Sequence, residues 1–225
     1  CAAVECIHSY SLIHDDLPCM DDDKIRRGKP STHIKFGEAS AVLAGNSLLT
    51  LAFEIIADKN YSINPKLKNQ IIKSLAFCSG HTGIAGGQEL DLKFENKKKS
   101  LKQIIAMQKK KTGKLFNFCL YAVGVIAKRN NKEKILLSTL GEEIGLLFQF
   151  ADDFLDVKGS RKLVGKPIKK DNKKGKSTLL SLMGYEKAHN YANNLKKKIL
   201  LKLKKHGKKA KDLSDTIEFI LGRDF

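Results

Sequence analysis

Apolar residues recur three or four positions apart along most of the chain, which is the spacing of one face of an α-helix. Within residues 1–16, for example, Ala3, Val4, Ile7 and Tyr10 fall on such a face. No strand-like alternation is sustained, and the chain has only four prolines. We therefore predict an all-α fold, with further helices over residues 38–57, 66–82, 101–111, 115–127, 138–157 and 190–205.

Two clusters of aspartates interrupt this apolar pattern. The first, over residues 14–27, reads HDDLPCMDDDKIRR, and the second, over residues 149–156, reads QFADDFLD inside an apolar helical pattern. Carboxylates this close repel one another unless a cation lies between them. Structural salt bridges to lysine are the plainer explanation. Two acidic helices can also face each other across a bundle and hold divalent metal ions between them, and this is the interpretation we favour.

The spacing within each cluster supports a common site. Pro18 should end the first helix after Asp16, so that residues 21–23 lie on a loop that folds back toward Asp15. Residues 26–30, RRGKP, read as a rigid basic turn, and arginine forks match phosphate oxygens. His8 precedes Asp15 by two helical turns, while Asp152 and Asp156 share one helical face. Carboxylates for metal beside arginines for phosphate predict a diphosphate site.

The charge, cysteines and apolar stretches narrow the class of protein. The net charge is +18, but the basic residues are nearly all lysines in runs with few aromatics, so we interpret them as solvated helix faces and predict no nucleic-acid binding. Five cysteines without a C-x-x-C pair suit free thiols. The apolar stretch 115–127 is too short to span a bilayer, and no signal peptide is visible. We expect a cytoplasmic protein without stable membrane anchoring.

Several motifs in order resemble the trans-isoprenyl diphosphate synthases, most closely the bacterial farnesyl diphosphate synthases (geranyltranstransferases). They cover nearly the whole chain and comprise DDLPCMD at 15–21, RRG at 26–28, GGQ at 86–88, KT at 111–112, FQFADDFLD at 148–156, GK at 165–166 and GKST at 175–178. The resemblance implies an isoprenoid synthase-type helical bundle with a central cavity, usually a homodimer. It also implies a Mg²⁺-dependent prenyltransferase that condenses isopentenyl diphosphate with dimethylallyl or geranyl diphosphate to give farnesyl diphosphate.

The same resemblance assigns roles to individual residues, with roughly two or three Mg²⁺ ions per subunit. The metal ligands would be Asp15, Asp21, Asp152 and Asp156, with Asp16 supporting. The allylic diphosphate would contact Arg26, Lys111, Thr112, Gln149, Lys166 and Lys176, and isopentenyl diphosphate would contact His8 and Arg27. The residues counted as catalytic are Asp15, Asp16, Asp21, Arg26, Lys111, Asp152 and Lys166. Tyr10, with Ser11 beside it, would limit product length.

Alternatives of other kinds remain open. Family members carry an upstream Gly-Lys-Arg motif that is not present here, so we expect residues 1–225 to be one domain that lacks the family's N-terminal helices. The protein could then be an inactive fragment or a non-catalytic partner subunit, although such subunits tend to lose one aspartate cluster. A geranylgeranyl diphosphate synthase is the alternative among active enzymes. A class I terpene cyclase also uses aspartates and Mg²⁺ but usually lacks the second cluster.

Overall fold

The computed structural model describes residues 1–164 and 178–222, without the side chains of 158–164. Helices form nearly all of this part, as predicted. The elements in chain order are α1 (Ala2–Asp15), β1 (Ile25–Arg26), β2 (Lys29–Pro30), α2 (Thr32–Phe36), α3 (Glu38–Ala57), α4 (Pro65–Ser79), α5 (Ile84–Phe94), α6 (Leu101–Gln108), the π-helix η1 (Lys109–Gly113), α7 (Lys114–Ile126), α8 (Asn131–Val164), α9 (Leu179–Met183), α10 (Tyr185–Lys204), the 3₁₀-helix η3 (Gly207–Ala210) and α11 (Lys211–Gly222).

Local sequence signals explain several helix ends. Asn64 caps α4 by accepting a hydrogen bond from the Lys66 amide, and Pro65 occupies the first helical position, where its missing N–H costs nothing. Ser100 and Gln103 form a reciprocal capping box at the start of α6. The expected range 38–57 coincides with α3, whereas α8 extends beyond the expected 138–157 at both ends. Its polar first turns lie outside the apolar pattern that predicted it.

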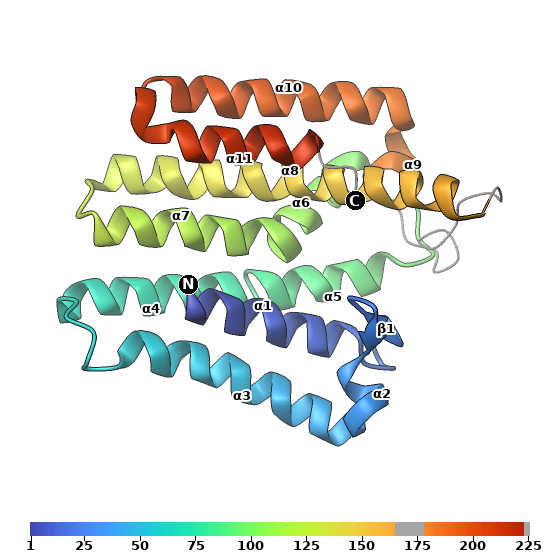
Figure 1. Cartoon of the computed structure of the whole chain (residues 1–225), viewed down its shortest axis with the longest axis horizontal. Coiled ribbons are helices and arrows are strands. Elements are labelled where there is room, and N and C mark those ends of the chain that lie inside the picture. The colour runs from blue at the N-terminus through green and yellow to red at the C-terminus, as the bar shows by residue number, and fades with distance from the viewer. Residues whose placement is uncertain (165–177, 223–225) are drawn as a thin grey trace.

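The helices are arranged in layers (Figure 1), with α10 and α11 over α8, α7 beside α8, and α1, α3, α4 and α5 on the far side of α7. Two groups of buried residues hold the layers together. One lies around α8 and includes Leu147, Phe150 and Ile217, and the other joins α1, α4 and α7 and includes Ile7 and Phe118. Each such side chain contributes about 2 kcal/mol on burial.

A short hairpin connects α1 to α2. Ile25 pairs with Pro30 and Arg26 with Lys29, and the two residues between them, Arg27 and Gly28, have φ angles of 52° and 74°. Positive φ at both central residues is the mark of a two-residue type I′ turn. The basic turn predicted over residues 26–30 is therefore confirmed, and it takes the form of a two-stranded ribbon.

Helix α3 is more exposed than the core helix that its apolar sequence suggests. Its Gly45 lets it approach α1 closely, because a Cβ there would lie 2.0 Å from His14 Nε2. Three of its apolar side chains, Val42, Leu43 and Leu51, are nevertheless exposed, Leu43 to 65%. Among the described residues α3 is the one helix long and apolar enough to cross a membrane, with 17% of its most apolar stretch buried.

Candidate active site

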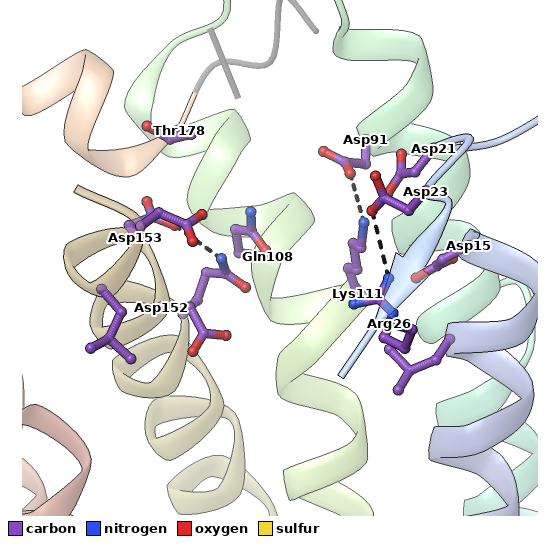
Figure 2. Close-up of a pocket in the computed structure, with 14 residues that line it drawn as sticks. Asp15, Asp21, Asp23, Arg26, Asp91, Gln108, Lys111, Asp152, Asp153 and Thr178 are labelled. Carbon is purple, nitrogen blue, oxygen red and sulfur yellow. Dashed lines mark hydrogen bonds and ion pairs between the residues drawn. The ribbon is translucent and has the colours of Figure 1, made fainter. Parts of the chain in front are cut away.

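Aspartates from both predicted clusters line one cavity of about 420 Å³, which we call the carboxylate cavity. Figure 2 shows Asp15, Asp21 and Asp23 on one side, facing Asp152 and Asp153 on α8 across the opening. The prediction that the two clusters face each other is confirmed. The lining residues are Leu12, Asp15, Asp21, Asp23, Arg26, Asp91, Gln108, Lys111, Gln149, Asp152, Asp153, Leu155, Asp156 and Thr178.

The first wall of the carboxylate cavity is built by the end of α1 and the loop after it. Helix α1 ends at Asp15, and Pro18 lies in the turn that follows. The Asp21 amide donates a hydrogen bond to the Asp15 carbonyl at 2.8 Å, which brings the loop back over the helix end. The loop and its return toward Asp15, both expected from the sequence, are confirmed.

Asp16 serves this wall without lining the cavity. It is 2% exposed and forms an ion pair with Arg26, whose Nε lies 3.2 Å from both carboxylate oxygens. Asp23 Oδ2 adds a longer contact to Arg26 at 3.7 Å. The hydrogen bond that Arg26 donates to Asp16 and the negative charge of Asp16 raise the pKa of Arg26 above its ordinary value, although burial opposes them. Asp16 thus holds a permanent cation at the edge of the cavity.

The second wall is one regular stretch of α8. Asp152 and Asp156 both line the cavity, as their four-residue spacing predicts. Asp153 is 6% exposed and accepts hydrogen bonds from Gln149 Nε2 at 3.0 Å and from the Leu179 amide at 3.1 Å. The second bond secures Leu179, the first residue of α9, and Thr178 caps this helix.

Lys111 lies between the two walls on the π-helix η1. Its Nζ donates to Asp91 Oδ2 at 2.7 Å (Figure 2). A Cβ on Gly87 would lie 2.2 Å from the Lys111 amide nitrogen, so only glycine lets α5 approach η1 this closely. The glycine-rich segment before Gln88 thus packs against η1. Next to Lys111, Thr112 Oγ1 donates to Gln149 Oε1 at 3.2 Å.

A second cavity of about 450 Å³ continues from the first, and we call it the apolar cavity. Leu12, Asp15, Lys111, Gln149 and Asp152 line both cavities, so they form the junction between them. The residues that line only the apolar cavity are Val4, Glu5, His8, Ser11, Ile84, Gln88, Thr112, Leu115, Phe116, Cys119 and Phe148.

His8 and Asp15 contribute to the apolar cavity from one face of α1, as their spacing predicts. The Arg27 guanidinium lies 3.5 Å from His8 Nε2. Burial is the main cause that lowers the pKa of His8 below 6.5, with Arg27 and Arg26 acting in the same direction and Glu5 opposing them. His8 and Arg27, both assigned to isopentenyl diphosphate by the resemblance, therefore lie side by side.

Tyr10 and Ser11 have different surroundings. Ser11 lines the apolar cavity, whereas Tyr10 lies on the opposite face of α1 in the core, and its hydroxyl donates to the Ser79 carbonyl at 3.3 Å. Tyr10 lines neither of these two cavities. Its assignment as the residue that limits product length stays a prediction.

Some residues of the site were missed or lie elsewhere. Lys166 and Lys176 fall outside the described residues. The carboxylate cavity also contains Asp23, Asp91, Asp153 and Gln108, which the sequence did not assign to it. For Asp91 a signal existed, because it follows Gln88 by three residues and so shares its helical face.

The donor atoms of the carboxylate cavity fit Mg²⁺. They are carboxylate oxygens, the ligands that hard cations prefer. Within residues 1–164 and 178–222, no three acidic, histidine or cysteine side chains converge closely enough to hold an ion by themselves. Mg²⁺ is commonly held by one or two carboxylates together with substrate phosphates and water. The two facing walls suit a cation that arrives with a diphosphate.

Comparisons with known proteins agree with this geometry. The chain matches the polyprenyl synthetase family over residues 1–218. A farnesyl diphosphate synthase from Bacillus subtilis is 42% identical over 187 residues, which cover 83% of this chain and 63% of that protein. The chain therefore spans less than two thirds of that relative.

Two solved structures share the fold. An FPP/GFPP synthase from Zymomonas mobilis has a TM-score of 0.86 and 40% identity, over 97% of this chain and 74% of the other. A Helicobacter pylori geranyltransferase complexed with magnesium and isoprenyl diphosphate has a TM-score of 0.84 and 35% identity, over 98% of this chain and 72% of the other. The all-α fold of the isoprenoid synthases is thus confirmed, and this chain belongs to the polyprenyl synthetase family.

Proposed function

We propose that the chain carries the site of a Mg²⁺-dependent prenyltransferase that condenses isopentenyl diphosphate with an allylic diphosphate, with farnesyl diphosphate as the main product. The observation that carries the proposal is the junction of the two cavities. A cavity lined by carboxylates, Arg26 and Lys111 suits a metal-bound diphosphate, and the apolar cavity beside it suits a prenyl chain. The reacting carbon would lie between them.

The proposed reaction begins with ionisation of the allylic diphosphate. The carbon–oxygen bond breaks, its electron pair leaves with the diphosphate, and an allylic cation remains. Bound Mg²⁺, held by Asp15, Asp21, Asp152 and Asp156, would supply positive charge to the leaving group. Arg26 and Lys111 add fixed positive charge there. Lys166 and Lys176 keep their proposed role at the same diphosphate.

The second substrate would react from the apolar cavity. His8 and Arg27 are proposed to bind isopentenyl diphosphate so that its double bond faces the cation and forms the new carbon–carbon bond. The released diphosphate then accepts the proton that is lost. Apolar walls contributed by Leu115, Phe116 and Phe148 would exclude water that could quench the cation.

The exposed face of α3 supports the proposed homodimer. Helix α3 carries three exposed apolar side chains, Val42, Leu43 and Leu51, and only 17% of its most apolar stretch is buried. Apolar residues exposed to this extent on a soluble protein commonly mark an interface. Burial of α3 against a second copy would also be consistent with a cytoplasmic enzyme. Analytical ultracentrifugation of the purified chain tests this assembly, and a Leu43→Glu variant should shift it toward monomer.

Product analysis tests the activity directly. The purified chain is incubated with Mg²⁺, isopentenyl diphosphate and either dimethylallyl or geranyl diphosphate. A fifteen-carbon diphosphate that disappears with EDTA or in Asp15→Ala is the expected result. A cyclic hydrocarbon formed without isopentenyl diphosphate would instead indicate a terpene cyclase, and a twenty-carbon product would indicate a geranylgeranyl diphosphate synthase. Because the chain spans under two thirds of its relative, a folded sample without product would favour an inactive fragment or a partner subunit.

A further inference from the structure

The side-chain amide of Gln88 lies at the apolar cavity, and the proposed function gives it no role. Its side chain lines that cavity and is not among the residues of the carboxylate cavity. The residue is 7% exposed, and within the described part of the chain neither Nε2 nor Oε1 has a hydrogen-bond partner. A buried amide without partners is costly to the folded chain, so its presence here calls for a ligand that pairs with it.

The position of Gln88 is fixed on both sides by contacts to η1. Before it, Gly87 lies against the backbone of Lys111, where an added Cβ would come within 2.2 Å of the amide nitrogen. One turn after it, Asp91 binds Lys111 Nζ at 2.7 Å. The backbone at Gln88 therefore cannot move away from the cavity without disturbing the contacts of Lys111.

The other amide at the junction is already engaged. Gln149 accepts from Thr112 at 3.2 Å and donates to Asp153 at 3.0 Å. Gln88 has both its donor and its acceptor available, and it lies on the side of the junction where the prenyl chain would lie. A diphosphate held in the carboxylate cavity would direct its prenyl chain through the junction into the cavity that Gln88 lines.

On this basis, which rests on the proposed function, we propose that Gln88 is a catalytic residue whose side-chain carbonyl oxygen stabilises the positive charge on the allylic carbon. A preorganised dipole in a cavity without water stabilises charge that develops in the transition state more than it stabilises the neutral substrate. Rotation of the unpartnered amide lets the oxygen, rather than the nitrogen, face the cation. The bond changes are those of the proposed ionisation, and Gln88 exchanges no proton or electron.

The test measures binding, so it does not depend on turnover. Two diphosphates of equal length are compared by calorimetry in the presence of Mg²⁺. One carries an ammonium nitrogen in place of the third carbon of the allylic unit, which shares the positive charge of the cation, and the other keeps a neutral saturated carbon there, so that neither can ionise. The proteins are wild type, Gln88→Met, Gln88→Glu and Gln108→Met, the last as a control because Gln108 lines only the carboxylate cavity.

Wild type should prefer the ammonium analogue. In Gln88→Met this preference should fall by about tenfold to a hundredfold, while affinity for the neutral analogue changes less than about twofold. Gln88→Glu should restore the preference, since a carboxylate also stabilises the cation, and Gln108→Met should keep it. Because Gln88→Met removes an unpartnered buried amide without changing the volume much, its Tm without ligand should stay equal or rise.

Other outcomes overturn the inference in distinguishable ways. If Gln88→Met keeps the full preference, or weakens both analogues equally, Gln88 does not act on the cation, and the proposed function stands. A lower Tm in Gln88→Met with unchanged preference would indicate a structural glutamine that pairs with water. If wild type binds neither analogue, the proposed function fails and the inference fails with it.

Discussion

Each acidic wall contains two adjacent aspartates with different positions. The first aspartate of each pair is placed alike in the two walls, whereas the second aspartate has different partners in each. In each pair the first member, Asp15 or Asp152, lines both cavities. The second member, Asp16 or Asp153, is almost fully buried and binds protein groups. Adjacent residues on a helix point about 100° apart. Asp16 accordingly faces away from the carboxylate cavity, whereas Asp153 lines that cavity but does not reach the apolar cavity.

The difference lies in what the buried member holds. Asp16 binds the guanidinium of Arg26, a side chain that itself lines the carboxylate cavity. Asp153 binds the neutral amide of Gln149 and the backbone amide of Leu179. The buried aspartate of the α1 wall therefore positions a cation at the carboxylate cavity, whereas that of the α8 wall orders a neighbouring side chain and the start of α9. Under the proposed function, the first contact would serve diphosphate binding and the second would serve structural order.

The largest expected effect follows substitution of the members that line the cavity. Asp15→Asn and Asp152→Asn should each lower product formation at least about a hundredfold, because each removes a charge that holds the metal-bound diphosphate. Their Tm should stay within a few degrees of wild type, since loss of one of several like charges relieves repulsion. Product assays and thermal unfolding are measured on the same samples. A variant that loses Tm in proportion to activity would contradict the division between the members that line both cavities and the members that are almost fully buried.

Asp16→Asn should affect both stability and binding. The change removes the charged partner of Arg26 and should lower the free energy of unfolding by about 2 kcal/mol, the range for hydrogen bonds to charged groups. Affinity for an allylic diphosphate analogue should fall about tenfold, because Arg26 is no longer held at the cavity.

Asp23→Asn serves as the control for Asp16→Asn in urea unfolding. The more exposed, 3.7 Å contact between Asp23 and Arg26 should contribute less than about 1 kcal/mol. Equal losses of stability in the two variants would contradict the role given to Asp16.

Asp153→Asn should have a smaller effect, confined to stability. An asparagine oxygen can still accept from the Leu179 amide, but its nitrogen then faces another donor, Gln149 Nε2, so about one hydrogen bond or 1 kcal/mol is lost. Analogue affinity should remain within about twofold. Urea unfolding and calorimetry again provide the measurements. A tenfold loss of affinity would show that the two buried aspartates act alike and would remove the contrast between the walls.

The sequence predicted the helices and the meeting of the two acidic clusters. Helical period identified α1 and α3 closely, and Pro18 indicated the loop that returns to Asp15. These features depend on spacing and on single residues with strong local preferences. The exposure of α3 was not predicted. An apolar helix sequence indicates that the helix should be buried, but it does not show whether this chain or another molecule covers it.

The contacts behind the lining residues could not be read from the sequence. Asp91 and Lys111 are 20 residues apart, and the Asp153 bond to Leu179 joins residues 26 apart. Their pairing depends on how α5, η1, α8 and α9 pack. The unpartnered state of Gln88 likewise depends on every side chain around it. Residue type showed which groups could bind a ligand, and the tertiary contacts decide which of them are already engaged.

The smallest expected effect concerns His8, which shares the α1 wall with Arg27. Because burial and the arginines lower the pKa of His8 below 6.5, the unfolded chain takes up a proton at a higher pH than the folded chain does. The free energy of unfolding should therefore fall as the pH drops from 6.5 through the lowered pKa, and His8 should contribute nothing to this slope well above 6.5.

Urea unfolding at pH 7.5 and 5.5 measures the change in the free energy of unfolding, and His8→Gln should reduce this change. The same substitution at the exposed His206 is the control, and an equal change in both variants would show that Arg27 and burial do not act on His8 in particular. A reduction confined to His8→Gln would show that burial and the neighbouring arginines act on His8. With the Asp16 contact to Arg26, this would be the second place at which arginines influence residues of the α1 wall, a feature that the described contacts of the α8 wall do not share.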